Sequence, residues 1–464
     1  MKNLVKKYIS VLLLLCISAI SYAQTSSLST GYFLEGNLYR YRLNPAFMGV
    51  RGYFSLPAAG NVSINASSDL GLANFIYPTS DGNGLVTFLH PDVSIEDFNS
   101  SLSDKNRISA SADINIISFG YFGFGGYNTF DIGLHSNVGL NIPRDMFLFM
   151  KDMGHERYEI SDLSAYTRNY VDIAFGHSHK VTRDLTIGAR LKVLLGVAYA
   201  ELLMEKMEME MSNTKWLINA KGSAAAAAGL KLSYDENGVY ESMDGVKIGL
   251  NGLGFGVDLG AVYDLSNVLT KGLVVSASVN DISYMSWKNV AKAGLNPAEP
   301  YVFDGFEAFG VGEKEGEENT SLNAQFEQIG EDLSDFFALK DQGVADKTEF
   351  FGATLNIGVE YKMPFYSKMS VGALFSNRFD KLSPYTKGSL MLNISPLKVF
   401  DFAVSGTAST YGMGWGAMIN FHCPGFNLFL GADSFVGKLG KQYIPLGKTN
   451  TSVSLGVNIP FRRK

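Results

Sequence analysis

The sequence predicts an all-β protein: a transmembrane antiparallel β-barrel of about 14 strands, with an N-terminal plug segment and a helical insertion in a long extracellular loop. Three observations predict this class: a period of two in many segments, an unusual composition, and alternating short and long connections. In residues 351–361 apolar side chains alternate with Gly, Thr, Asn and Glu, and residues 451–461 repeat the pattern. Only a β-strand turns that period into two different faces. In a membrane barrel the apolar face meets lipid and the polar face lines the lumen.

The composition supports a barrel. Charged residues make up only 18% of the chain, while Gly numbers 49, Phe 32 and Tyr 23, and the mean hydropathy is +0.05. Lumen-facing positions dilute the apolar average of a barrel in this way. The formal net charge of -6 excludes the basic stripe typical of nucleic-acid binders, so no nucleic-acid partner is expected.

The N-terminus predicts export. Lys2, Lys6 and Lys7 precede an apolar run over residues 11–20, and Ser21-Tyr22-Ala23 provides small residues at −3 and −1. This is the pattern of a secretory signal peptide, assigned to residues 1–23. The rest contains one cysteine, Cys423, and no apolar run of the length that a spanning helix needs. An exported chain of this kind is expected in the outer membrane of a Gram-negative bacterium.

The elements follow in order. Residues 24–59 carry several Tyr and Phe but no strand pattern, and we expect them to plug the lumen or cap its periplasmic mouth. The barrel is assigned to residues 60–464. Its predicted wall strands are 60–70, 106–122, 127–140, 165–178, 185–211, 251–264, 273–287, 349–362, 369–379, 386–395, 399–410, 413–422, 426–436 and 451–461.

The connections support an even strand count, because bacterial barrels alternate short periplasmic turns with longer outside loops. Every second connection is short and contains Gly, Pro, Asp or Lys, as tight turns need. The long connections are 71–105, 141–164, 212–250, 288–348 and 437–450. Two of the outside ones are short, near Ser383-Pro384 and Tyr411-Gly412, which the alternation permits.

Two long loops have patterns of their own. Residues 212–250 are expected to form an external β-hairpin excursion that turns at residues 235–238, instead of a further pair of wall strands. Within the extracellular insertion 288–348, apolar residues recur at steps of three and four over residues 321–338, which predicts an amphipathic helix in an acidic setting. This helix either lies over the barrel mouth with its apolar face inward, or forms a docking surface or gate.

Ionisable residues that share a strand face with Gly and Ser are expected in the lumen, because a charge on the lipid side costs about 2–4 kcal/mol at mid-bilayer. Two interpretations stay open: a structural network of luminal ion pairs, and a solute-binding lumen. The candidates are Asp113, Asp131, His135, Asp172, Arg190, Lys192, Asp258, Glu360, Arg378 and Asp433.

An enzyme is not predicted, and neither a cofactor nor a metal site is expected. His135 and Ser136 are adjacent, so on a strand they point to opposite faces and cannot form a nucleophile–base pair. His177 and His179 share a face, but beside a periplasmic turn. The methionines of residues 204–211 could bind copper(I), whereas a strand extending beyond the bilayer with a soft apolar face explains them more simply.

Several segments resemble a known group of barrels. Asn44-Pro45-Ala46, just before the first wall strand, is similar to the Asn-Pro-Ala signature of FadL-type and PorV/PorP-type barrels. Residues 256–263 and 276–283 resemble the hairpin that those barrels share. With the helical insertion, the chain most closely resembles an uncharacterised family, a domain of unknown function, of Bacteroidota outer-membrane β-barrels.

The resemblance implies fourteen strands around an N-terminal plug, with Asn44, Pro45 and Ala46 setting the turn of that plug. It also implies a FadL-like channel or transporter for small hydrophobic or amphipathic compounds. The alternative is a scaffold, associated with type IX secretion or another system, that binds a partner protein; a barrel-embedded lipid hydrolase is third. The expected partners are outer-membrane lipid and either a hydrophobic small molecule or a secretion-system protein.

Overall fold

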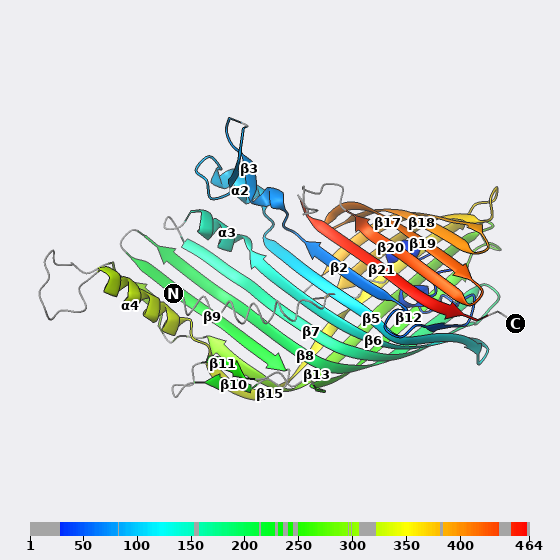
Figure 1. Ribbon diagram of the computed structural model, residues 1–464, viewed down its shortest axis with the longest axis horizontal. Helices are drawn as coiled ribbons and strands as arrows, with labels where there is room; N and C mark the ends of the chain where they lie inside the picture. Colours follow the sequence, from blue (N-terminus) through cyan, green and yellow to red (C-terminus); the bar gives the residue numbers. More distant parts are fainter. Residues whose placement is uncertain are drawn as a thin grey trace, which may run out of the picture.

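The structure is a computed structural model, and Figure 1 shows one long barrel with strands tilted along it. It describes residues 28–81, 83–152, 157–212, 215–227, 231–234, 240–244, 249–295, 297, 299–305, 322–380, 384–435 and 447–461. Within these, the side chains of residues 231–234, 240–244, 322–326 and 434–435 are not described. The predicted signal peptide, the turn at 235–238 and Ser383 lie outside the described residues.

The wall is a closed antiparallel barrel with fourteen strand positions, which confirms the predicted fold class. The first position is shared by β1 (Tyr53–Ser55) and β2 (Val62–Ser68), both paired with β21 and β5. The other thirteen are β5 (Lys105–Gly123), β6 (Gly126–Pro143), β7 (Arg157–Lys180), β8 (Leu185–Met211), β12 (Gly252–Asp264), β13 (Leu273–Leu295), β15 (Lys340–Lys362), β16 (Met369–Phe379), β17 (Tyr385–Leu397), β18 (Phe400–Ser409), β19 (Gly412–Cys423), β20 (Phe426–Phe435) and β21 (Thr449–Pro460).

The first strand begins earlier than the sequence predicted. The wall starts at Tyr53, not at residue 60, because residues 56–61 interrupt the strand and hide β1 from a pattern search. Pro57 cannot donate to a ladder, and Ala58 has a positive φ of 56°. Residues 56–61 stay hydrogen-bonded to both neighbouring strands, β5 and β21. The Ala58 N–H donates to the Ile116 carbonyl at 3.0 Å, and the Val457 N–H donates to the Ala59 carbonyl at 2.9 Å.

One side of the wall continues beyond the rest. β12 begins opposite Gly196 of β8, yet β8 runs on to Met211. β9 (Trp216–Ala227) fills this gap by pairing with β8, with β13 and with β14 (Tyr301–Phe303). The predicted excursion of 212–250 is therefore only partly right: β9 joins the sheet, while β10 (Lys231–Tyr234) and β11 (Tyr240–Asp244) form a separate hairpin. The free edges of β8 and β13 explain why β9 pairs there.

The long-loop end carries the helices (Figure 1). Between β2 and β5 lie η4 (Leu72–Asn74), β3 (Ile76–Pro78), β4 (Leu85–Thr87) and α2 (Ile95–Ser101). With α3 (Arg144–Lys151) they bury a small core around Phe88, Phe98 and Phe147. We call residues 69–102 the outer lobe.

The predicted amphipathic helix is α4 (Leu322–Phe336), which lies at the far tip of the extended wall in Figure 1. Leu333 and Phe336 pack against an apolar cluster that includes Met207, Met209 and Met211. The methionines thus form the soft apolar face of a strand beyond the bilayer. No described helix is long and apolar enough to cross a membrane.

The outer surface has the profile of a membrane wall. Large apolar side chains are exposed along most strands, and aromatic ones gather at both ends. Tyr284, Phe350, Phe379 and Trp415 lie toward the long loops, while Phe122, Phe365, Phe426 and Phe461 lie toward the short turns. Such girdles bound the apolar band of a transmembrane barrel, and the short-turn end is the periplasmic one.

Candidate functional site: the lumen and its plug

The predicted N-terminal plug is present. Residues 28–52, called here the plug segment, lie inside the short-turn half of the barrel and include η2 (Ser29–Gly31) and η3 (Arg40–Arg42). Two apolar clusters join the segment to the wall, one around Tyr39, Tyr41 and Phe429, the other around Tyr32 and Phe33. These four tyrosine and phenylalanine side chains of the segment are at most 3% exposed. They fill the lumen and do not merely cap its mouth.

The Asn-Pro-Ala tripeptide fixes the plug segment to one side of the wall. The Asn44 side-chain amide donates to the carbonyls of Ala261 in β12 (3.3 Å) and Ala277 in β13 (3.2 Å). Its oxygen accepts from the Ala46 N–H at 2.9 Å, which closes a tight turn. Each polar atom of this fully buried side chain is thereby satisfied.

Leu43, the residue before this tripeptide, adds a second anchor. The Leu43 carbonyl accepts hydrogen bonds from the Ser278 hydroxyl (2.7 Å), the Asn280 amide (2.6 Å) and the Asn356 amide (3.0 Å). These donors come from β13 and β15. The plug segment and the wall are therefore joined by polar contacts from three strands.

Two wall glycines make room for this turn. Gly188 of β8 and Gly260 of β12 are cross-strand partners. A Cβ on Gly260 would lie 2.1 Å from Asn44 Oδ1, and one on Gly188 would lie 2.2 Å from the Pro45 carbonyl oxygen. Glycine inside a strand often marks the close approach of another backbone, and here the two together form a recess for the tripeptide.

Asp433 of β20 holds the other end of the plug segment. Its carboxylate accepts from the Ser29 N–H and hydroxyl, both at 2.5 Å, and from the Thr30 N–H at 3.0 Å. The Lys387 ammonium donates to the same Ser29 hydroxyl at 2.9 Å. Asp433 thus anchors the start of η2.

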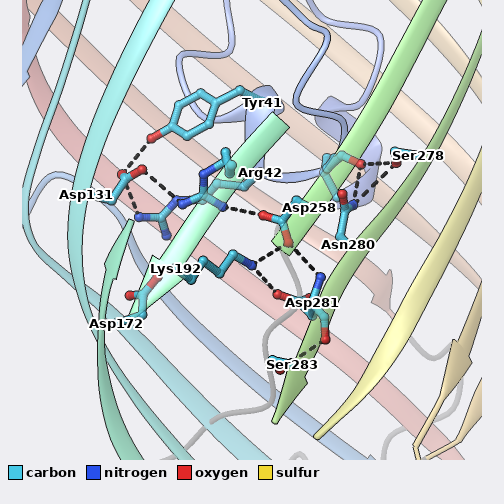
Figure 2. Close-up of polar contacts among 12 residues, drawn as sticks. Tyr41, Arg42, Asp131, Asp172, Lys192, Asp258, Ser278, Asn280, Asp281 and Ser283 are labelled. Carbon is cyan, nitrogen blue, oxygen red and sulfur yellow. Dashed lines mark hydrogen bonds and ion pairs between the residues drawn. The ribbon is translucent and has the colours of Figure 1, made fainter. Parts of the chain in front are cut away.

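The centre of the lumen holds a chain of ion pairs (Figure 2). Asp131 accepts from Tyr41 (2.7 Å), Arg42 (3.0 Å) and Arg190 (3.0 Å). Arg190 also pairs with Asp258 at 2.9 Å. Two of these groups belong to the plug segment, so the network crosses from plug to wall.

Lys192 extends the chain. It pairs with Asp258 at 2.7 Å and with Asp281 at 2.6 Å. Asp281 has a positive φ of 60°, at the point where the pairing of β13 shifts register against β12 and β15. The bulge turns this carboxylate toward Lys192, which a regular strand would not do.

His135 bridges two carboxylates on the neighbouring strands. Its Nδ1 lies 2.5 Å from Asp113 and its Nε2 lies 2.8 Å from Asp172, while the ring stacks on Tyr170. With both nitrogens engaged, this imidazole is a structural link. Nothing in its contacts leaves a nitrogen to activate a nucleophile.

Farther toward the long loops, a second charged group surrounds aromatic rings. Arg378 donates to Asp380 at 3.2 Å, and Arg168 pairs with Glu349 at 3.1 Å. Trp287 donates to the same Glu349 at 2.8 Å. Of this group only Arg378 was a sequence candidate, although Arg168 shares its strand face with Asp172.

All ten candidate side chains are between 0 and 8% exposed. Nine of them take part in the contacts described above, whereas Glu360 stands apart with Ser370 near the periplasmic rim. There Glu35 of the plug segment pairs with Lys362 at 2.6 Å. Burial raises the pKa of Glu35, but the charges of Lys362 and Arg40 outweigh it and hold that pKa below its ordinary value.

Two cavities follow one another above the plug segment. The inner one, of about 60 Å³, is polar; Ser29, Arg42 and Leu43 of the plug segment line it. The outer one, of about 20 Å³, is lined by aromatic and charged side chains, and Asp281 lies on both. Plug-segment residues line the inner cavity and not the outer one.

His177 and His179 also have partners. His177 Nδ1 lies 2.9 Å from Asn128 Oδ1, and His179 Nδ1 lies 3.2 Å from His177 Nε2. The Ser136 hydroxyl donates to Asn169 at 2.6 Å. Across the described ranges, no group of three or more His, Cys, Asp or Glu side chains could hold a metal ion.

Comparison with known proteins gives one matching family and several similar solved structures. The model of a family described as "Family of unknown function (DUF5723)" matches residues 45–433. The toluene transporter TbuX of Ralstonia pickettii is similar in structure, with a TM-score of 0.43, 9% identity, and coverage of 91% of this chain and 94% of that one. A FadL homologue of Pseudomonas aeruginosa is similar with a TM-score of 0.42 and 10% identity, over 95% of this chain and 100% of that one. The toluene transporter TodX of Pseudomonas putida is similar with a TM-score of 0.41 and 10% identity, over 95% of this chain and 98% of that one. No curated protein matches this chain.

Proposed function

This chain belongs to the Family of unknown function (DUF5723), and we propose that it is an outer-membrane channel, held closed by its plug segment, that takes up small amphipathic solutes from the long-loop end. The proposal rests on one observation. Three of the residues that anchor the plug segment also line the inner cavity: Ser29, Arg42 and Leu43. A solute bound there competes directly with the contacts that keep the channel closed.

The polar anchors suit this role. A hydrogen bond inside a protein contributes only about 0.5–1.5 kcal/mol net, because a new partner can replace the old one. A solute that offers its own polar group to Asn280 or Asn356 replaces the Leu43 carbonyl at little cost. Opening therefore requires an exchange of partners, not the loss of buried hydrogen bonds.

The chemistry of the path favours an amphipathic solute. Tyr166, Tyr170 and Phe351 line the outer cavity together with Arg168 and Arg378. Aromatic faces attract apolar and π-bearing groups, while guanidinium groups bind carboxylates. The inner cavity is also lined mostly by polar or charged side chains, but it has one aromatic ring, Tyr385, where the outer cavity has three. A purely apolar solute would have no favourable place there.

Uptake by reconstituted protein tests the proposal. Purified wild-type protein in liposomes should admit an aromatic acid such as benzoate faster than glucose, with saturation at high concentration. Arg378→Gln should weaken the benzoate preference, whereas Lys288→Gln, at an exposed ion pair, should leave it unchanged. Equal rates for both solutes, or no uptake above protein-free liposomes, would exclude the channel.

A second function, a scaffold for a partner protein, is favoured by one feature. The outer lobe exposes Leu85 (75%) and Leu89 (52%) beyond the membrane band. Removal of both side chains (Leu85→Ser with Leu89→Ser) should then release any protein that co-purifies with the barrel. Retention of that protein by the double variant would count against the scaffold.

A further inference from the structure

An open apolar groove lies on the lipid-facing side of β15–β18. It measures about 680 Å³, in the range of pockets that hold drug-sized ligands. Val359, Val371 and Leu390, exposed by 41%, 38% and 71%, stand along it. Almost all of its lining is apolar. Convex lipid-facing walls have no such hollow, so the feature requires a local cause.

Small residues cause the hollow. Leu390 pairs with Ala373 on one side and with Gly406 on the other, so one tall side chain stands between two short ones. A Cβ on Gly406 would meet nothing within 4 Å. The groove is therefore set by the sequence of the lipid face and not by a gap in the strand ladder, which is continuous there.

The groove lies close to the periplasmic rim, because its lining includes Tyr361, one residue before the end of β15, and Val371, two residues after the start of β16. Two lysines lie in the adjoining turns. Lys368 ends the β15–β16 turn and Lys398 lies in the β17–β18 turn; both are exposed. The two turns are joined, because the Ser395 N–H donates to the Lys368 carbonyl at 2.8 Å and the Lys368 ammonium donates to the Pro396 carbonyl at 2.8 Å. Each lysine near a membrane surface attracts anionic headgroups.

We propose that this groove is a binding site for one phospholipid of the periplasmic leaflet, with an acyl chain along Ala373, Leu390 and Gly406 and the phosphate against Lys368 and Lys398. The apolar lining faces the hydrocarbon band, where acyl chains are the available apolar ligand. The basic rim supplies the complementary charge for a phosphate. This site is independent of the lumen and of the proposed channel.

Native mass spectrometry of purified protein tests the site. Gly406→Leu fills the groove without a clash, whereas Gly388→Leu, also exposed with nothing within 4 Å, lies on the same face but outside the groove lining. Wild type and Gly388→Leu should each retain one phospholipid, and Gly406→Leu should lose it. Equal retention by the two glycine variants would overturn the proposal.

Charge variants test the headgroup contact. Binding of phosphatidylglycerol from mixed detergent micelles should weaken about fivefold per lysine in Lys368→Gln with Lys398→Gln. The matched control is Arg183→Gln with Lys271→Gln, which removes two exposed charges from other turns of the same rim. An equal loss in both double variants would refute the site. So would a dimer, in place of a lipid adduct, that disappears only in Gly406→Leu.

Discussion

Gly260→Val should open the proposed channel by displacing the plug segment while leaving the wall intact. The new Cβ would lie 2.1 Å from Asn44 Oδ1, 2.9 Å from Pro45 Cδ and 3.1 Å from the Ala46 nitrogen. The first distance is too short for any packing adjustment of a few tenths of an ångström. β-branched residues suit strands, so β12 keeps its pairing and the turn of the plug segment must move.

The size of the effect follows from the contacts that are lost. Displacement of Asn44 breaks its hydrogen bonds to the Ala261 and Ala277 carbonyls, worth about 2 kcal/mol together. The population with a displaced turn then rises about 30-fold. If the three bonds to the Leu43 carbonyl break as well, the total is about 5 kcal/mol and the rise is several thousandfold, on the order of 10³–10⁴.

Conductance across a planar lipid bilayer measures this opening. Wild type should be closed for most of the recording, and Gly260→Val should be open for a much larger fraction of it. Gly406→Val is the matched control, because that glycine faces open space on the lipid side. A Gly260→Val trace like that of wild type, with circular dichroism showing an intact barrel, would refute the role of the recess. Equal opening by Gly406→Val would refute it too.

Three further changes probe the plug, the ion network and the outer lobe. Asp433→Asn should weaken the charge-assisted bonds at the start of the plug segment by about 2–4 kcal/mol in total, so trypsin should cut that segment faster than in wild type. Arg190→Met leaves Asp131 and Asp258 with less compensation, and the free energy of unfolding in urea should fall by about 3–5 kcal/mol. Phe98→Ala empties a fully buried position of the outer lobe, so proteolysis of residues 69–102 should accelerate at an unchanged unfolding midpoint of the barrel.

Within the membrane band the sequence was sufficient to place the strands. β16 has the predicted bounds of 369–379, and β12 begins one residue after its predicted start and ends at the predicted residue 264. Lipid on one side and a polar lumen on the other force alternation on each strand, so the pattern is local and readable. Beyond the bilayer that constraint ends. The start of β15 at Lys340 was missed because residues 340–347 are charged and exposed, and neither face there must be apolar.

In the lumen, the alternation of apolar and polar residues predicted which way a side chain points, but not which residue it contacts. Asp433 could be placed on the inner face from its strand, yet its partner Ser29 lies 404 residues earlier in the chain. Asp281 was missed because it sits at a bulge, where alternation fails. Arg168 could have been predicted from the sequence, because it shares one face of β7 with Tyr170 and Asp172. Its ion pair with Glu349 shows that it should have been among the lumen candidates.

The recess shows most clearly why a site can escape sequence reasoning. Gly188 and Gly260 are 72 residues apart and each is ordinary in a glycine-rich chain; only the pairing of β8 with β12 sets them opposite one another. A cross-strand pair without side chains would leave a void in the lumen if nothing covered it, and voids lose the contacts of the atoms that line them. The Asn-Pro-Ala turn covers it. Opening of the proposed channel would therefore expose this recess to water or to solute.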